Sequence, residues 1–138
     1  MPDQVKSDED QLLKLHQKVL EAHLKSNVEL ILEDENDSYV VANRGTVAHP
    51  TKEERRQRLD PYLQATIFEE YRDEITPVVQ ISPEGMLGWV IVQVYARGTQ
   101  KTQDGNAAPI EFVSAWIELY EKRANRWFRT GNVSNFKS

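Results

Sequence analysis

The chain has 138 residues, 39% of them hydrophobic and 28% charged, which is the length and composition of one globular domain with its own core. Its 17 basic and 22 acidic residues give a net charge of −5, which argues against nucleic acid or an anionic membrane as the main partner. Cysteine is absent, which excludes disulfides, thiol catalysis and cysteine metal sites. We expect a single cytoplasmic domain over residues 1–138, with no membrane-spanning segment.

The first third of the chain predicts two helices. Ser7 and Asp10 have the spacing of a capping box, and leucine, valine and histidine then recur every three or four residues up to Leu24. We therefore expect a long amphipathic helix that begins after Ser7 and ends near residues 25–27. Asn27 is expected to cap a second, short helix.

The middle of the chain predicts one strand and further helix. Ser38–Asn43 alternates as a strand does, and Arg44 and Gly45 end it. Thr51 and Glu54 form another capping box at the start of helical residues 52–65. Because Pro61 is unfavourable inside a helix, these residues are expected to form two short helices.

The rest of the chain reads as strands. Ile67–Ile81 is expected to be extended and interrupted at Pro77, and three long strands follow, Met86–Lys101, Pro109–Arg123 and Arg126–Phe136. This order predicts an α+β fold in which a curved antiparallel sheet wraps around a long N-terminal helix and shorter helices. Such a sheet leaves a conical cavity at the end that the long helix does not fill.

Neither face of these last strands has the regular polar positions of a solvated surface. In Trp89–Arg97 and Phe112–Glu121, one set of alternate positions is aliphatic and the other mixes aromatic with polar side chains. Both faces must therefore be covered. We assign the mixed set of both strands to the cavity and the aliphatic set to a homodimer interface, while the reverse assignment stays open.

Three stretches of the sequence resemble the nuclear transport factor 2-like superfamily: Leu20–Asn27, Ala115–Arg123 with the Arg126-Trp127 that follows its turn, and Thr130–Phe136. In element order the similarity covers nearly the whole chain, in the branch of small cystatin-like proteins related to ketosteroid isomerase and to the association domain of calmodulin-dependent kinase. The resemblance implies a cystatin-like cone. This fold hosts isomerases, dehydratases, hydrolases and assembly domains.

Glu118 is the most informative carboxylate, because it lies in mid-strand between Trp116 and Tyr120. Aromatic neighbours desolvate a carboxylate and raise its pKa, which would suit Glu118 to proton transfer near neutral pH. The alternative is a structural role, in which Glu118 pairs with Arg97 or Arg129 across strands or lies in a subunit interface.

His16 and His23 share one face of the long helix. At the helical rise their seven-residue separation is about 10 Å, too far for one metal ion to bridge. We expect hydrogen-bonded histidines at the margin of the core, and the alternative is that His23 points into the cavity as a base or donor. No metal and no cofactor are expected.

These observations predict a small-molecule-binding domain with a pocket between the first helix and the sheet. The alternative is a non-catalytic homodimeric assembly module, and a third hypothesis is an isomerase or dehydratase in which Glu118 or His23 moves the proton. The expected partners are a second copy of the chain and a small molecule. The expected pocket residues are His23, Tyr39, Trp89, Gln93, Tyr95, Trp116, Glu118 and Asn132.

Overall fold

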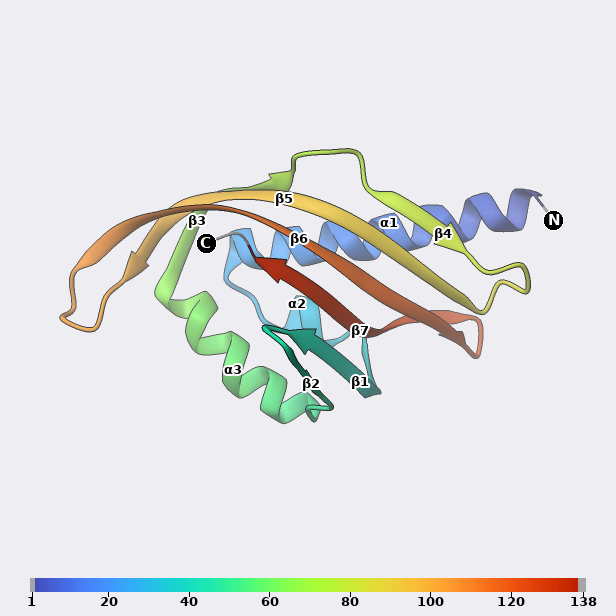
Figure 1. Ribbon diagram of the computed structural model, residues 1–138, viewed down its shortest axis with the longest axis horizontal. Coiled ribbons are helices and arrows are strands. Elements are labelled where there is room, and N and C mark those ends of the chain that lie inside the picture. Colours follow the sequence, from blue (N-terminus) through green and yellow to red (C-terminus); the bar gives the residue numbers. More distant parts are fainter. Residues whose placement is uncertain (1, 137–138) are drawn as a thin grey trace.

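The computed structural model describes residues 2–136, which form helices on one face of a curved sheet (Figure 1). The helices are α1 (Pro2–Lys25), α2 (Glu29–Leu32) and α3 (Lys52–Ala65), and the strands are β1 (Glu35–Asn43), β2 (Thr46–Ala48), β3 (Thr66–Asp73), β4 (Val78–Ile81), β5 (Leu87–Lys101), β6 (Ala107–Arg123) and β7 (Arg126–Phe136). The predicted α+β fold with a long N-terminal helix is confirmed. None of the described helices is long and apolar enough to cross a bilayer.

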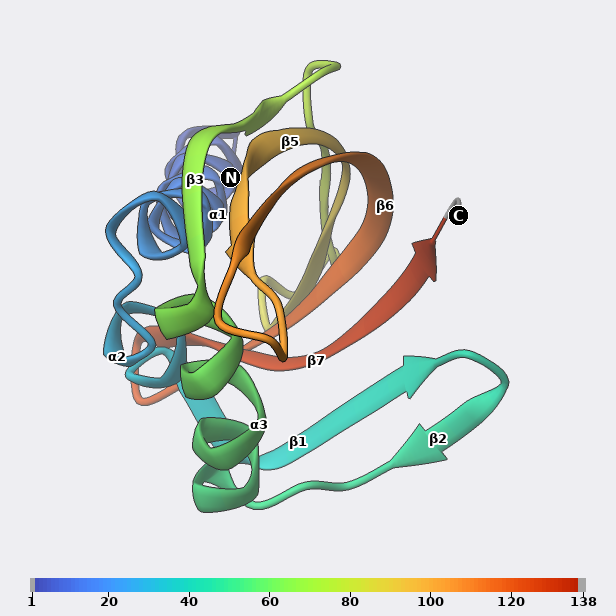
Figure 2. The ribbon, with the colours of Figure 1, turned by 90° about the vertical axis from the view of Figure 1, so that its left-hand side faces the viewer.

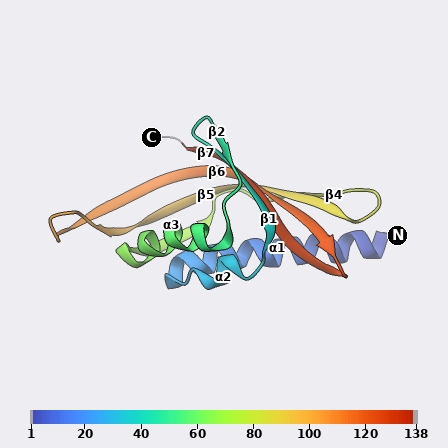
Figure 3. The same ribbon diagram turned by 90° about the horizontal axis from the view of Figure 1, so that it is seen from below.

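The sheet has the strand order β2-β1-β7-β6-β5-β3, and β4 also pairs with β5. Most pairs are antiparallel, as predicted, but β1 runs parallel to β7. Figure 3 shows the three helices below this sheet, and Figure 2 shows the β1–β2 hairpin at its edge, close to α3. The strand β2 was not predicted, and β1 begins three residues earlier than expected, at Glu35.

The first helix begins at Pro2, so the predicted start after Ser7 is wrong. Proline suits the first turn of a helix, because its missing N–H would have no partner there. Asp8, expected at the exposed start of the helix, is buried, and its Oδ1 accepts a hydrogen bond from Trp127 Nε1 at 2.9 Å and pairs with Lys122 Nζ at 2.9 Å. These contacts with the β6–β7 hairpin outweigh the local capping signal.

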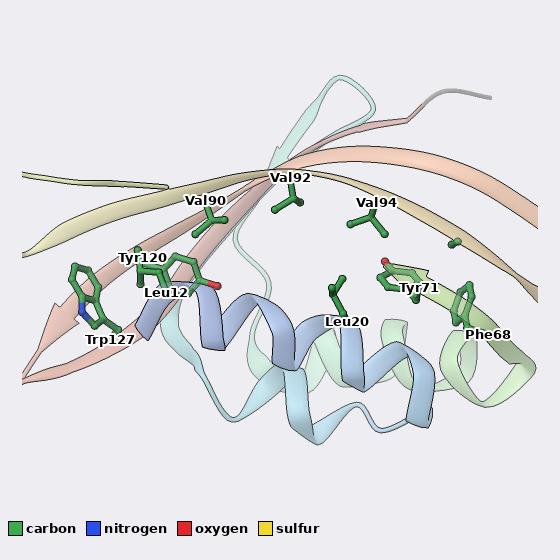
Figure 4. Packing of buried hydrophobic residues seen from close by; sticks show 10 residues of the cluster. Leu12, Leu20, Phe68, Tyr71, Val90, Val92, Val94, Tyr120 and Trp127 are labelled. Carbon is green, nitrogen blue, oxygen red and sulfur yellow. The ribbon is translucent and has the colours of Figure 1, made fainter. Parts of the chain in front are cut away.

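The main core lies between α1 and β5 (Figure 4). Val90, Val92 and Val94 project from β5 toward the helix, and at most 1% of each is exposed. Leu12 and Leu20 meet them from α1. The aliphatic positions of β5 therefore form the core.

The third helix is continuous through Pro61, although two short helices were predicted. Its capping box is confirmed, since Glu54 N donates to Thr51 Oγ1 at 3.1 Å and Thr51 N donates to Glu54 Oε1 at 2.9 Å. Leu59 and Leu63, on either side of the proline, pack into one cluster with α1 and α2. This packing offsets the backbone hydrogen bond that proline removes.

A β-bulge in β7 changes which of its side chains face the helices. Leu119 of β6 lies opposite Gly131, but the next residue, Tyr120, lies opposite Arg129, so one residue of β7 is left over. The alternation therefore reverses, and Arg129 turns to the helix side. A side chain at Gly131 would place its Cβ 2.6 Å from the carbonyl oxygen of Val40, so only glycine lets β1 pass this closely.

We expect Gly131→Ala to destabilise the protein by about 1–3 kcal/mol, the usual range for overpacking, because β1 must move away from β7. Urea unfolding measures this change. Gly105→Ala is the comparison for backbone strain without packing, since Gly105 has a φ of +84° and no atom lies within 4 Å of the added Cβ. Because Gly131 does not have a positive φ, its loss should come from packing, and an unchanged stability of Gly131→Ala would contradict the close packing against β1.

Candidate functional site

A cavity of about 630 Å³ opens between the C-terminal half of α1, α3, the β1–β2 hairpin and the inner face of β6 and β7. It occupies the part of the cone that α1 leaves unfilled. The apolar and aromatic side chains of its wall include Val19, Ile31, Leu59, Tyr62, Tyr71, Phe112 and Trp116. The polar ones include His23, Tyr39, Arg55, Ser114, Glu118, Arg129, Asn132 and Ser134.

The structure divides the predicted pocket residues between the two faces of the sheet. Val92 of β5 lies opposite Trp116 of β6, so the aliphatic set of β5 shares a face with the mixed set of β6. The expectation that Trp89, Gln93 and Tyr95 line the cavity is therefore wrong, because they lie on the outer face. His23, Tyr39, Trp116, Glu118 and Asn132 do lie at the cavity wall, and their part in binding stays a prediction.

Glu118 is buried and fully engaged in hydrogen bonds. Its Oε2 accepts from His16 Nδ1 at 2.7 Å and from Trp116 Nε1 at 2.8 Å, and its Oε1 accepts from Tyr120 OH at 2.6 Å. Burial alone would raise the pKa of Glu118, but the donors and the charges of His16 and Arg129 hold it below its usual range. The predicted rise in pKa is wrong, and Glu118 is an ionised acceptor rather than a base for neutral pH.

His16 is a buried cation held between two carboxylates. Its Nδ1 donates to Glu118 and its Nε2 donates to Asp73 Oδ1 at 2.6 Å. Carboxylates only accept, so both ring nitrogens carry protons. Although burial lowers the pKa of His16, the two carboxylates raise it above its usual value. Among residues 2–136, no cluster of three or more histidine or acidic side chains could hold a metal ion.

His23, unlike His16, is neutral. Its Nδ1 donates to the Val19 carbonyl at 2.8 Å, so in the neutral ring Nε2 is the acceptor nitrogen. Burial lowers the pKa of His23 to about 4, and its ring stacks on Tyr71 with centroids 3.9 Å apart. No described residue donates to Nε2. His23 is therefore a neutral acceptor in the cavity wall.

Arg129, like Arg55, is a residue of the cavity wall that the sequence analysis did not place there. Its side chain is 2% exposed, and its guanidinium donates to the Ile31 carbonyl at 2.9 Å and to Tyr120 OH at 3.3 Å. Regular alternation from Asn132 would place Arg129 on the outer face, and the bulge reverses this. The available signal was Gly131, since glycine within a strand often marks a bulge.

The remaining polar groups are held by contacts across the cavity wall. Arg55 of α3 donates to both oxygens of Glu35, at 3.0 and 2.5 Å, and its guanidinium lies 4.5 Å from the centre of the Tyr39 ring. The Tyr39 hydroxyl donates to Asn132 Oδ1 at 2.6 Å, and Asn132 donates to Ser134. These bonds connect α3, β1 and β7 around the cavity.

Comparison with known proteins gives structures but no sequence family. No family model and no curated protein matches the chain. A scytalone-dehydratase-like protein of Novosphingobium aromaticivorans superposes with a TM-score of 0.80 at 9% identity, covering 100% of this chain and 89% of its own. The association domain of the Caenorhabditis elegans calmodulin-dependent kinase II has a TM-score of 0.68 at 14% identity, covering 96% and 98%.

A third structure is an NTF2-like protein of unknown function in nutrient uptake from Rhodospirillum rubrum. Its TM-score is 0.70 at 13% identity, and the match covers 92% of this chain and 98% of the other. Likeness at such low identities shows the fold alone. Other matching structures are described as having a cystatin-like fold, which confirms the fold that the family resemblance implied.

We expect the stability of the protein to fall at alkaline pH because of His16. The pKa of His16 is raised in the folded state, so its contribution is fully present below the ordinary value of 6.5 and is lost as the pH rises through the folded value. His16→Gln removes one partner of a buried ion pair and should cost about 3–5 kcal/mol near neutral pH, and less at alkaline pH. Urea unfolding over a pH series measures both effects.

The matched control is His49→Gln, which changes an exposed histidine between β2 and α3. This variant should keep both the stability and the pH profile of the original protein. If His16→Gln kept the alkaline fall in stability, the titrating group would be another residue, and His16 would not be the buried cation.

Proposed function

We propose that this protein, whose fold is that of NTF2-like proteins, binds a small organic molecule in the cavity beside α1. One observation carries the proposal: a cavity of about 630 Å³ has an apolar and aromatic wall into which a few polar side chains converge. Its volume lies within the range of roughly 300–1,000 Å³ of small-molecule sites. The apolar wall would supply affinity, and the polar groups would fix the orientation of the ligand.

Preorganisation supports binding at this place. Tyr39 and Asn132 are joined by a hydrogen bond of 2.6 Å, and Arg129 is fixed by the Ile31 carbonyl and Tyr120. A ligand that meets such groups loses less free energy in ordering them than one that binds mobile side chains.

Binding is better supported than proton-transfer catalysis. An isomerase or dehydratase reaction through Glu118 is disfavoured, because the carboxylate already accepts three hydrogen bonds and has a lowered pKa. His23 remains the candidate base, since its Nε2 is an acceptor in the cavity wall. A reaction would also need an acid on the other side of the substrate, and the buried Tyr39 and Tyr71 have raised pKa values.

The test is a screen of acidic, neutral and basic aromatic compounds by protein-observed NMR, followed by titration of those that bind. Ala48→Trp places an indole in the mouth of the cavity and should weaken binding at least tenfold. Val47→Trp changes the neighbouring residue of β2, which is 70% exposed and points away from the cavity, and should leave binding unchanged. Equal effects of both variants, or no binding by any compound, would contradict the proposal.

A second proposed function, homodimerisation through the outer face of the sheet, rests on a separate observation. Across β5 and β6, Ile91 lies opposite Ile117 and Trp89 lies opposite Leu119. The face continues through Val78 of β4, which is 46% exposed. No described residue covers this face, and monomers rarely expose apolar patches above roughly a few hundred Å². An assembly module would use the same surface, with or without a ligand in the cavity.

We expect the chain to sediment at twice its mass of 16.0 kDa at micromolar concentration. Ile117→Lys puts a charge in the centre of the outer face and should give a monomer, because the charge would be buried without a partner. Leu24→Lys, at a 45% exposed position on α1, is the matched control and should stay dimeric. If the unsubstituted protein sedimented as a monomer, the proposed dimer would be refuted, while the proposal of ligand binding in the cavity would be unaffected.

A further inference from the structure

The charges around the cavity differ from those of the chain as a whole. The protein has a net charge of −5, yet the cavity is lined by more arginine than acidic side chains. The charged residues of its wall are Arg44, Arg55, Arg58, Arg129, Glu54 and Glu118. The cavity wall is therefore locally positive, although the net charge of the protein is negative.

Both glutamates are already occupied by the protein. Glu54 accepts a hydrogen bond from the backbone N–H of Thr51 at the start of α3. Glu118 accepts from His16, Trp116 and Tyr120. Glu118 has no capacity left for a ligand cation, and Glu54, which is exposed, is a single carboxylate against four arginines in the wall.

Some of these arginines lie at the mouth of the cavity, and one lies at its floor. Arg44 and Arg58 are exposed, and neither makes an ion pair or a hydrogen bond with any described residue. Arg55 is neutralised by Glu35. The two free guanidinium groups leave the mouth positive.

Arg129 lies at the floor with no carboxylate in direct contact. Two of the five donors of its guanidinium are used, both by uncharged oxygens, Tyr120 OH and the Ile31 carbonyl. The positive charge of Arg129 is compensated indirectly, because Tyr120, which accepts from Arg129, donates in turn to the carboxylate of Glu118. This arrangement leaves donors of Arg129 without a partner among the described residues.

We infer that the ligand of this cavity is an organic anion, a carboxylic acid on an aromatic or alicyclic body. The inference rests on the proposed binding function and names its ligand class. The carboxylate would pair with Arg129, because a planar guanidinium matches a carboxylate in geometry and charge. The body would lie against Trp116, Tyr62 and Leu59. Arg44 and Arg58 would attract the anion to the mouth.

The test compares 2-naphthoate with 2-naphthamide, two probes of the same shape that differ in charge. The acid should bind at least tenfold more tightly than the amide, and added salt should weaken only the acid. Arg129→Gln should remove the preference. Arg97→Gln is the control, since Arg97 pairs with Glu69 and Glu70 away from the cavity wall, and it should change nothing.

A second variant keeps the test valid if Arg129→Gln does not fold. The double variant Arg44→Gln with Arg58→Gln changes exposed side chains only, and it should reduce the preference for the acid severalfold. Equal binding of acid and amide, or a preference unchanged in the double variant, would overturn the inference and leave the proposed function standing. Failure of both probes, and of every neutral and basic compound in the screen, would overturn the proposed function itself.

Discussion

The rest of the structure depends on the hydrogen bonds that the buried carboxylate of Glu118 accepts. It joins α1 to the sheet through His16 and receives the side chains of Trp116 and Tyr120 from its own strand. A buried charge of this kind is costly unless hydrogen bonds and opposite charges compensate it, and removal of one partner leaves the others uncompensated. The same bonds that make Glu118 a strong anchor make it a poor base, so stability and proton transfer compete for one side chain.

Arg129 follows from this anchor and from the bulge in β7. The bulge turns the guanidinium inward, and Tyr120 connects it to the charge of Glu118. The protein thereby keeps a cation in an apolar wall without a directly bound acid. The charge of Arg129 is thus compensated within the protein, while some of its donors have no partner among the described residues.

The sequence predicted most of the helices and strands, but it did not predict which of their faces point to the cavity. Strong local signals, such as the capping box of Thr51 and the long alternating strands, predicted the helix starts and strands that they encode. Alternation within a strand cannot tell which of its sets faces the neighbouring strand, because pairing register decides this. Trp89 and Trp116 were therefore placed on one face, although the register puts them on opposite faces. The predictions based on Pro61 and Ser7, a break in α3 and a later start of α1, were wrong for another reason: tertiary packing outweighed the local preference of these residues.

The position of β2 has a consequence for how the cavity exchanges its contents. Three contacts fix α1 along its length: the hydrogen bond of Asp8 with Trp127, that of His16 with Glu118 and the stack of His23 on Tyr71. The short strand β2 pairs only with β1, through three residue pairs, and both strands contribute to the cavity wall. Within the described residues β2 is therefore the part of the wall held by the fewest strand pairs, so the entrance can widen there at the lowest cost in free energy while α1, β1 and the hydrophobic core stay packed.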